Sequence, residues 1–185
     1  MKQVIQDIKD GTTDTIEIPY PSVSKNHVII KSKMSLISAG TEKMLVEFGK
    51  SSYLGKAKQQ PEKVKMVLDK IKTDGLGSTI EAVQSKLNQP IPLGYSNVGE
   101  IIEIGENVND LSIGDIVVSN GPHAEIFKVS KNLCAKVPDG VNLSSAAFVV
   151  IGSIALQGIR LAKPTIGESF VVIGAGLIGL LTTQI

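Results

Sequence analysis

Residues 169–179 read SFVVIGAGLIG, and this stretch decides the fold of the C-terminal part of the chain. An apolar, β-branched run leads into the glycine pattern G-x-G-x-x-G, and apolar residues that can form a helix follow it. This order is typical of the first strand and helix of a dinucleotide-binding βαβ unit, in which the glycines allow a tight turn, the approach of a pyrophosphate and close helix–strand packing. The residues predicted to bind the cofactor are Gly174, Ala175, Gly176, Leu177, Ile178 and Gly179.

Two points about this loop stay open in the sequence. Glycine-rich turns between a strand and a helix also serve packing alone, so the motif has a second interpretation. The acidic residue that would hold the ribose is expected about 20 residues past the glycines, whereas the sequence ends at Ile185. The pattern therefore predicts NAD or NADP without choosing between them. We also expect that 169–185 is only the start of a Rossmann domain and that the 185-residue chain alone is inactive.

The net charge and the aromatic content of the chain indicate which kinds of binding partner to expect. The net charge is +1, aromatic residues make up 4% of the chain, and there is no tryptophan. Neither a strong positive field nor a stacking surface is expected, which argues against nucleic acid and anionic membranes as partners and favours a small-molecule substrate. Cys134 is the only cysteine, which suits a reducing compartment, and no apolar run of signal-peptide or membrane-spanning length is seen. We therefore expect a cytoplasmic protein.

The order of patterns predicts a mixed architecture. Short β-prone runs occupy the first residues and return after residue 97, each bounded by glycine, proline or aspartate. Between them, 61–88 has apolar residues at helical spacing and is predicted to form a helical hairpin, with Ser78 and Glu81 as a capping box. A linking helix is predicted for 146–168, ahead of the glycine loop.

Several ordered motifs resemble the medium-chain dehydrogenase/reductase superfamily. They are GYSNVGEIIEIGENV at 94–108, IGDIV at 113–117, GPHAE at 121–125 and AKVPDG at 135–140, together with the glycine loop. The resemblance covers nearly the whole chain except the hairpin. It implies a mainly β, GroES-like barrel that forms the substrate domain over 1–145, with an inserted helical hairpin. The first β-strand and helix of an α/β Rossmann domain would follow.

The chain departs from the zinc-using members of this family at the metal site. Ala39 stands where they have a cysteine, Tyr95 and Ser96 replace the ligand imidazole and the carboxylate, and 149–151 offers no ligand in place of the third. Because catalytic zinc needs about three protein ligands, we predict no metal. The departures resemble a zinc-free branch, the N-terminal half of two-part oxidoreductases in which a glucose–fructose-oxidoreductase-like half follows.

The resemblance assigns roles to several side chains. Tyr95 and Thr41 are the predicted catalytic residues, as proton donor and relay hydroxyl. Ser38, Ser96 and Glu42 are predicted to bind substrate, and Ser153 is added to the cofactor-binding residues. Two other interpretations of Tyr95 remain: a substrate contact without proton transfer, and a side chain that only packs with its hydroxyl paired.

These expectations lead to a zinc-independent, NAD(P)-dependent oxidoreductase that transfers hydride to or from an alcohol, a carbonyl or an activated alkene, with a sugar-derived compound among the candidate substrates. A GroES-like module used only for binding or scaffolding is the alternative, and a zinc-dependent alcohol or polyol dehydrogenase is the third hypothesis. Relatives often associate through the nucleotide domain, so a homo-oligomer formed there is also compatible with the resemblance.

Overall fold

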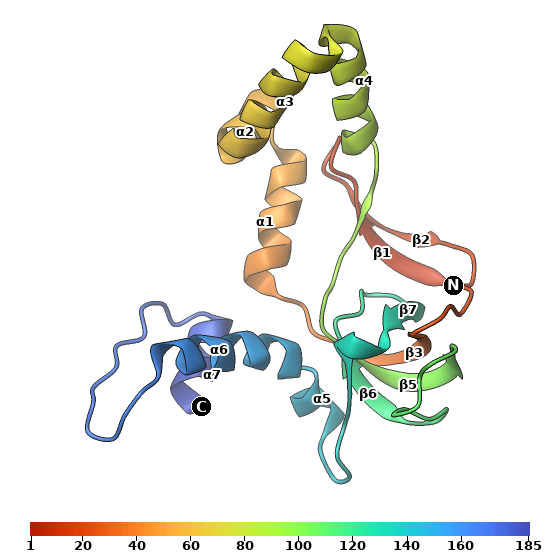
Figure 1. Cartoon of the computed structure of the whole chain (residues 1–185), viewed down its shortest axis with the longest axis vertical. Helices are drawn as coiled ribbons and strands as arrows, with labels where there is room; N and C mark the ends of the chain where they lie inside the picture. Colours follow the sequence, from red (N-terminus) through yellow and green to blue (C-terminus); the bar gives the residue numbers. More distant parts are fainter. The chain divides into compact units, whose positions relative to one another are not determined.

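A computed structural model describes residues 1–185, apart from the side chain of Tyr53. The chain divides into two compact units, and Figure 1 labels their helices and strands. Unit 1 consists of Met1–Gln3, Glu17–Ser38 and Gly94–Ile185, and unit 2 consists of Val4–Ile16 and Ala39–Leu93. The residues Ser38 and Ala39 are therefore consecutive in the chain but belong to different units.

Unit 1 contains a five-stranded antiparallel sheet in the order β7-β3-β5-β6-β8. Its central strands are rich in β-branched residues, and their inward side chains bury the main apolar core. The strands are β3 (His27–Ser35), β5 (Asn97–Ile104), β6 (Ile116–Ser119), β7 (Ile126–Ser130) and β8 (Cys134–Lys136). The core consists of Val28, Ile30, Ile101, Val108, Leu111, Val117, Phe127 and Val129.

Strand β3 carries a bulge near its end. Ser32 pairs with Gly99 and Met34 with Val98, so Lys33 is an extra residue without a partner in β5. In a regular strand, residues three apart point to opposite faces of the sheet, and one inserted residue changes this alternation. The bulge therefore lets the side chains of Ser32 and Ser35 point to the same side.

The expected closed barrel is not formed. Strands β7 and β8 are the edges of the five-stranded sheet, and no ladder joins them among the described residues. A barrel needs every strand to pair with two neighbours, and β8 has only three residues to offer. The remaining strands, β1 (Lys2–Gln6), β2 (Thr13–Glu17) and β4 (Ile91–Pro92), form a separate three-stranded sheet in the order β2-β1-β4.

Unit 2 is more helical than the sequence patterns indicated. It contains α1 (Ala39–Lys50), α2 (Tyr53–Gln59), α3 (Pro61–Asp74) and α4 (Leu76–Leu87). Helical structure therefore begins at Ala39, well before residue 61. The predicted capping box is wrong: the single residue Gly75, with φ 86°, ends α3 and precedes α4. Ser78 is therefore already inside the helix, where its hydroxyl donates to the Asp74 carbonyl at 2.5 Å.

Three helices follow the sheet of unit 1: α5 (Leu143–Ala146), α6 (Val149–Ala162) and α7 (Leu177–Gln184). Helix α6 lies within 146–168, the range predicted for the linking helix. It ends at Ala162 because Lys163 adopts the left-handed conformation, with φ 49°, and a proline follows. None of the described helices is long and apolar enough to cross a membrane.

The β-strand predicted ahead of the glycine loop is not formed either. Residues 169–173 have no assigned strand, and Val171 and Ile173 are 87% and 96% exposed. A strand needs a hydrogen-bonded neighbour, and no described segment of the chain pairs with this one. Residues 169–173 therefore have the apolar, β-branched composition of a buried strand but do not pair with any described strand.

Candidate active and cofactor-binding sites

The segment before β5 holds two of the predicted site residues. Gly94 has φ 90°, a conformation that favours glycine, and it leads into Tyr95, which is half-buried. Ser96 is fully buried, and its hydroxyl donates to the Ala147 carbonyl at 2.6 Å. This hydrogen bond connects the start of β5 to the end of α5. Because it uses the hydroxyl proton, the Ser96 oxygen can only accept a hydrogen bond from a substrate.

The other predicted residues of the site are near one another in the chain but are divided between the two units. Ser38, the last residue of this part of unit 1, is buried. In unit 2, Thr41 is exposed in the first turn of α1, and Glu42 beside it is buried. Unit 1 thus contains Ser38, Tyr95 and Ser96, whereas Thr41 and Glu42 belong to unit 2.

A polar cluster that sequence reasoning missed lies around the loop 121–123 in unit 1. His123 Nδ1 is 2.8 Å from Ser35 Oγ. Asn97 is fully buried, and its amide donates to Ser32 Oγ at 2.9 Å and to the Pro122 carbonyl at 3.1 Å. Its Oδ1 is the one buried side-chain oxygen or nitrogen in the described chain that has no hydrogen-bond partner. The motifs at 94–108 and 121–125 include Asn97 and His123 but gave them no role, and it is the bulge in β3 that brings Ser32 and Ser35 to them.

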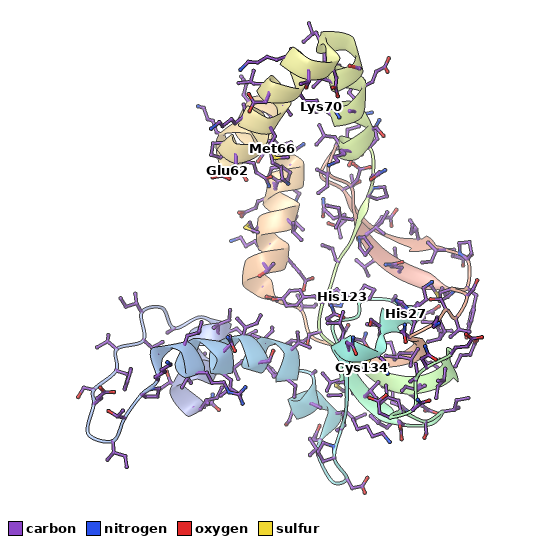
Figure 2. The ribbon with its side chains drawn as sticks, viewed as in Figure 1. His27, Glu62, Met66, Lys70, His123 and Cys134 are labelled. Atoms are coloured by element: carbon purple, nitrogen blue, oxygen red, sulfur yellow. The ribbon has the colours of Figure 1, made fainter. Side chains whose placement is uncertain are left out.

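The histidines and the cysteine lie on separate elements (Figure 2). His27 starts β3, His123 lies in a loop and Cys134 starts β8. Within the described part of the chain, no three His, Cys, Asp or Glu side chains are grouped so that they could hold a metal ion. Cys134 packs against the core of the sheet, and burial, followed by the nearby charge of Asp110, raises the pKa of its thiol to about 12.

The glycine loop combines a close backbone crossing with an open helix N-terminus. Gly174 has φ 100°, and a Cβ on Gly179 would lie 1.9 Å from the Gly174 carbonyl oxygen, so this crossing admits only glycine. Gly176 precedes α7, and a Cβ placed there meets nothing within 4 Å. The first intrahelical bond comes from Leu180 N to Gly176 O, at 2.9 Å. The amides ahead of it therefore face outward from the helix end, as anion-binding helices require.

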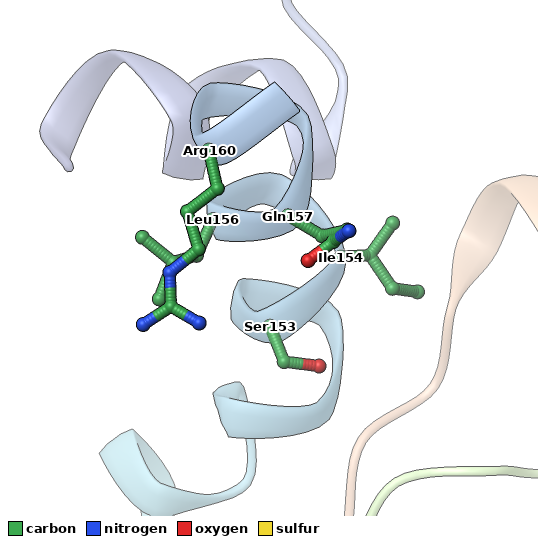
Figure 3. Close-up of a pocket in the computed structure, with 5 residues that line it drawn as sticks. All are labelled: Ser153, Ile154, Leu156, Gln157 and Arg160. Atoms are coloured by element: carbon green, nitrogen blue, oxygen red, sulfur yellow. The ribbon is translucent and has the colours of Figure 1, made fainter. Parts of the chain in front are cut away.

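An open groove of about 470 Å³ lies along α6 (Figure 3). Its lining residues are Ser153, Ile154, Leu156, Gln157 and Arg160. Ser153, predicted to bind the cofactor, is exposed, and its hydroxyl donates to the Val150 carbonyl at 2.6 Å. Arg160, the only arginine of the chain, and Gln157 were not predicted, because lone polar residues on an apolar helix carry no motif.

Comparison with known proteins agrees with this architecture. No family model matches the chain. The chain is 35% identical over 96 residues to D-guloside 3-dehydrogenase of Escherichia coli K12, a match that covers 50% of this chain and 27% of that protein. It is 27% identical over 122 residues to (R,R)-butanediol dehydrogenase of Bacillus subtilis 168, covering 51% and 35%. The chain thus spans about a third or less of these relatives.

A solved structure extends the comparison to the whole chain. Galactitol-1-phosphate dehydrogenase from Escherichia coli superposes with a TM-score of 0.71 at 21% identity, over 100% of this chain and 51% of that one. At this identity the likeness shows the fold alone. The chain therefore shares the fold of about half of that dehydrogenase, and the two sequence relatives named above are dehydrogenases.

Proposed function

We propose that the protein to which this chain belongs is an NAD(P)-dependent oxidoreductase that interconverts a secondary alcohol and a ketone. One observation carries the proposal: the close crossing of Gly179 and Gly174 at the start of α7, within a dehydrogenase fold. The names of the relatives suggest a polyhydroxylated substrate, because one acts on a guloside and another on a butanediol.

The residues present fit a dinucleotide. The open space over Gly176 lets a pyrophosphate approach the backbone, and the outward amides of Leu177, Ile178 and Gly179 can donate to it. The helix dipole adds attraction for the negative charge. When bound, the nicotinamide supplies or accepts the hydride. Whether the cofactor is NAD or NADP depends on groups beyond this loop.

Tyr95 is the proposed proton donor and acceptor. During alcohol oxidation the carbon loses a hydride, the hydroxyl loses its proton to the phenolate oxygen of Tyr95, and the C=O bond forms. During reduction Tyr95 returns that proton to the carbonyl oxygen. We propose Thr41 as the relay hydroxyl and Ser38 and Glu42 as substrate contacts; Ser96 would take part only as an acceptor.

We further propose that this chemistry proceeds without zinc. Support comes from the side chains at the positions of the metal ligands, where Ala39 has no ligand atom and the phenol of Tyr95 replaces an imidazole. The zinc-free, two-part architecture is part of the same proposal. So are a cytoplasmic location, suggested by the lone Cys134, and association of copies through the nucleotide domain.

Titration of the purified whole protein with NADH and NADPH, followed by nicotinamide fluorescence, tests the central claim. We expect saturable binding of one of the two reduced cofactors, and reduction of its oxidised form, NAD⁺ or NADP⁺, when polyols or glycosides are supplied. Absence of any fluorescence change at millimolar cofactor would refute the proposal and favour the scaffold alternative. Metal analysis of the same sample tests the second claim, because stoichiometric zinc contradicts it.

A further inference from the structure

The loop 121–123 is held against the sheet by side chains on two neighbouring strands. The Asn97 amide on β5 donates to the Pro122 carbonyl and to Ser32 Oγ on β3. Asn97 also pairs directly with Ser35 across the two strands. Because Asn97 is fully buried, these bonds are shielded from water and fix the position of the residue that follows Pro122.

That residue is His123, and its ring is oriented by a further contact. Its Nδ1 lies 2.8 Å from Ser35 Oγ, and the ring is half-buried. A histidine whose one ring nitrogen is held by a neighbouring hydroxyl has a restricted ring orientation, as in the supported imidazoles of enzyme sites. Ser35 can reach it because the extra residue Lys33 shifts the register of β3.

The ring lies directly against the backbone that leads to Tyr95. A Cβ placed on Gly94 would lie 2.6 Å from His123 N, 2.7 Å from the ring Cγ and 2.8 Å from Nδ1. Only the absence of a side chain at Gly94 permits this approach. The imidazole and the loop therefore occupy the space beside the Gly94–Tyr95 peptide and limit the movement of that peptide.

We propose that His123 is a positioning residue that holds Tyr95 in place through Gly94. This inference depends on the proposed function only in that Tyr95 is taken to be the proton donor and acceptor. The contacts that carry it, Ser35 to His123 and His123 to Gly94, are independent of any cofactor. Removal of the ring would free the Gly94–Tyr95 segment, while the sheet beneath it would keep its apolar core.

The experiment uses Tyr95 as its own reporter. The chain has no tryptophan and three tyrosines. Tyr20→Phe and Tyr53→Phe, together with replacement by phenylalanine of each tryptophan and tyrosine that the whole protein has outside this chain, leave Tyr95 as the only strong emitter. In this background, His123→Ala should lower the fluorescence anisotropy of Tyr95. His123→Phe, which keeps a ring against Gly94, should restore part of it, and Ser35→Ala should give a smaller decrease. His27→Ala is the matched control, because this ring lies at the start of β3, where its Nδ1 is 2.7 Å from the Lys25 carbonyl oxygen.

Turnover of the whole protein provides the second readout. Displacement of a catalytic group by about 1 Å can cost about a hundredfold in rate, so His123→Ala should lower kcat by about tenfold to a hundredfold with little change in cofactor affinity. Unchanged Tyr95 anisotropy in a folded His123→Ala variant would overturn the positioning role. A decrease in anisotropy with unchanged kcat would support that role and would instead refute the proposed chemistry of Tyr95.

Discussion

Replacement of Gly179 by alanine tests the cofactor site most directly. The new Cβ would lie 1.9 Å from the Gly174 carbonyl oxygen, whereas ordinary contact begins near 3.4 Å. The start of α7 and the loop must therefore separate by about 1.5 Å, which is the difference between these distances. A displacement of this size breaks a hydrogen bond between a backbone amide and a phosphate, since such bonds weaken steeply beyond about 3.2 Å.

The loss can be estimated from one bond. Hydrogen bonds to charged groups contribute about 1.5–3 kcal/mol, so Gly179→Ala should raise the Kd of NADH or NADPH by about 10-fold to 150-fold. Nicotinamide fluorescence titration of the whole protein measures this change. The matched control is Gly152→Ala within α6, where a Cβ meets nothing within 4 Å. That variant should keep the parental Kd and gain up to about 1 kcal/mol of stability from helix propensity.

Parental cofactor affinity in Gly179→Ala would refute the reasoning, provided that circular dichroism shows the same fold. It would mean that the phosphate does not use the start of α7. Equal weakening in both variants would show that any added methyl group in this region disturbs the protein, and the argument from the crossing of Gly179 and Gly174 would then fail.

Three further measurements test other parts of the structure. Tyr95→Phe should lower kcat by about 10²-fold to 10⁴-fold, the usual contribution of an acid–base group, with KM nearly unchanged; equal kcat would exclude proton transfer by this side chain. The Cys134 thiol, with its pKa raised to about 12 by burial, should resist iodoacetamide at pH 8 and react only after denaturation, which mass spectrometry can follow. The Lys136 ammonium and the Ser112 amide lower the pKa of the Asp115 carboxyl, so its stabilising contribution is present above the ordinary aspartate pKa of about 3.9 and is lost as the pH falls through the lower folded value. Asp115→Asn should therefore flatten the acid side of a plot of Tm against pH, and an unchanged profile would contradict this.

Sequence patterns predicted the turn and the helix start at 174–179, because these features depend on residues that are adjacent in the chain. The glycine spacing at 174–179 specified a turn and a helix start, and the structure has Gly174 at positive φ and α7 from Leu177. The position of a turn depends on a few adjacent residues, and these can be read directly. The strand expected at 169–173 depends instead on a neighbour that must pair with it, and no single segment encodes that neighbour.

The candidate site was only partly predictable for a related reason. Tyr95 and Thr41 were identified by resemblance to aligned motifs. His123, Asn97 and Ser35 are distant in sequence, and their association depends on a bulge that no residue pattern marks. The early start of helical structure at Ala39 was also missed, because Ala39 and Gly40 carry neither a cap nor an apolar periodicity.

The bulge at Lys33 makes the register between β3 and β5, more than the chemistry of any one residue, the quantity on which the loop 121–123 depends. Deletion of Lys33 would leave Ser32 opposite Gly99 and Ser35 opposite Asn97 in a regular ladder, so the two serines would be two positions apart and still on the same side of the sheet. Point substitutions at Lys33 and its deletion should therefore be tolerated, whereas a change that pairs Lys33 with β5 would turn Ser32 and Ser35 to opposite sides. In a population of homologous genes, position 33 would then be either absent or occupied by a freely varying side chain.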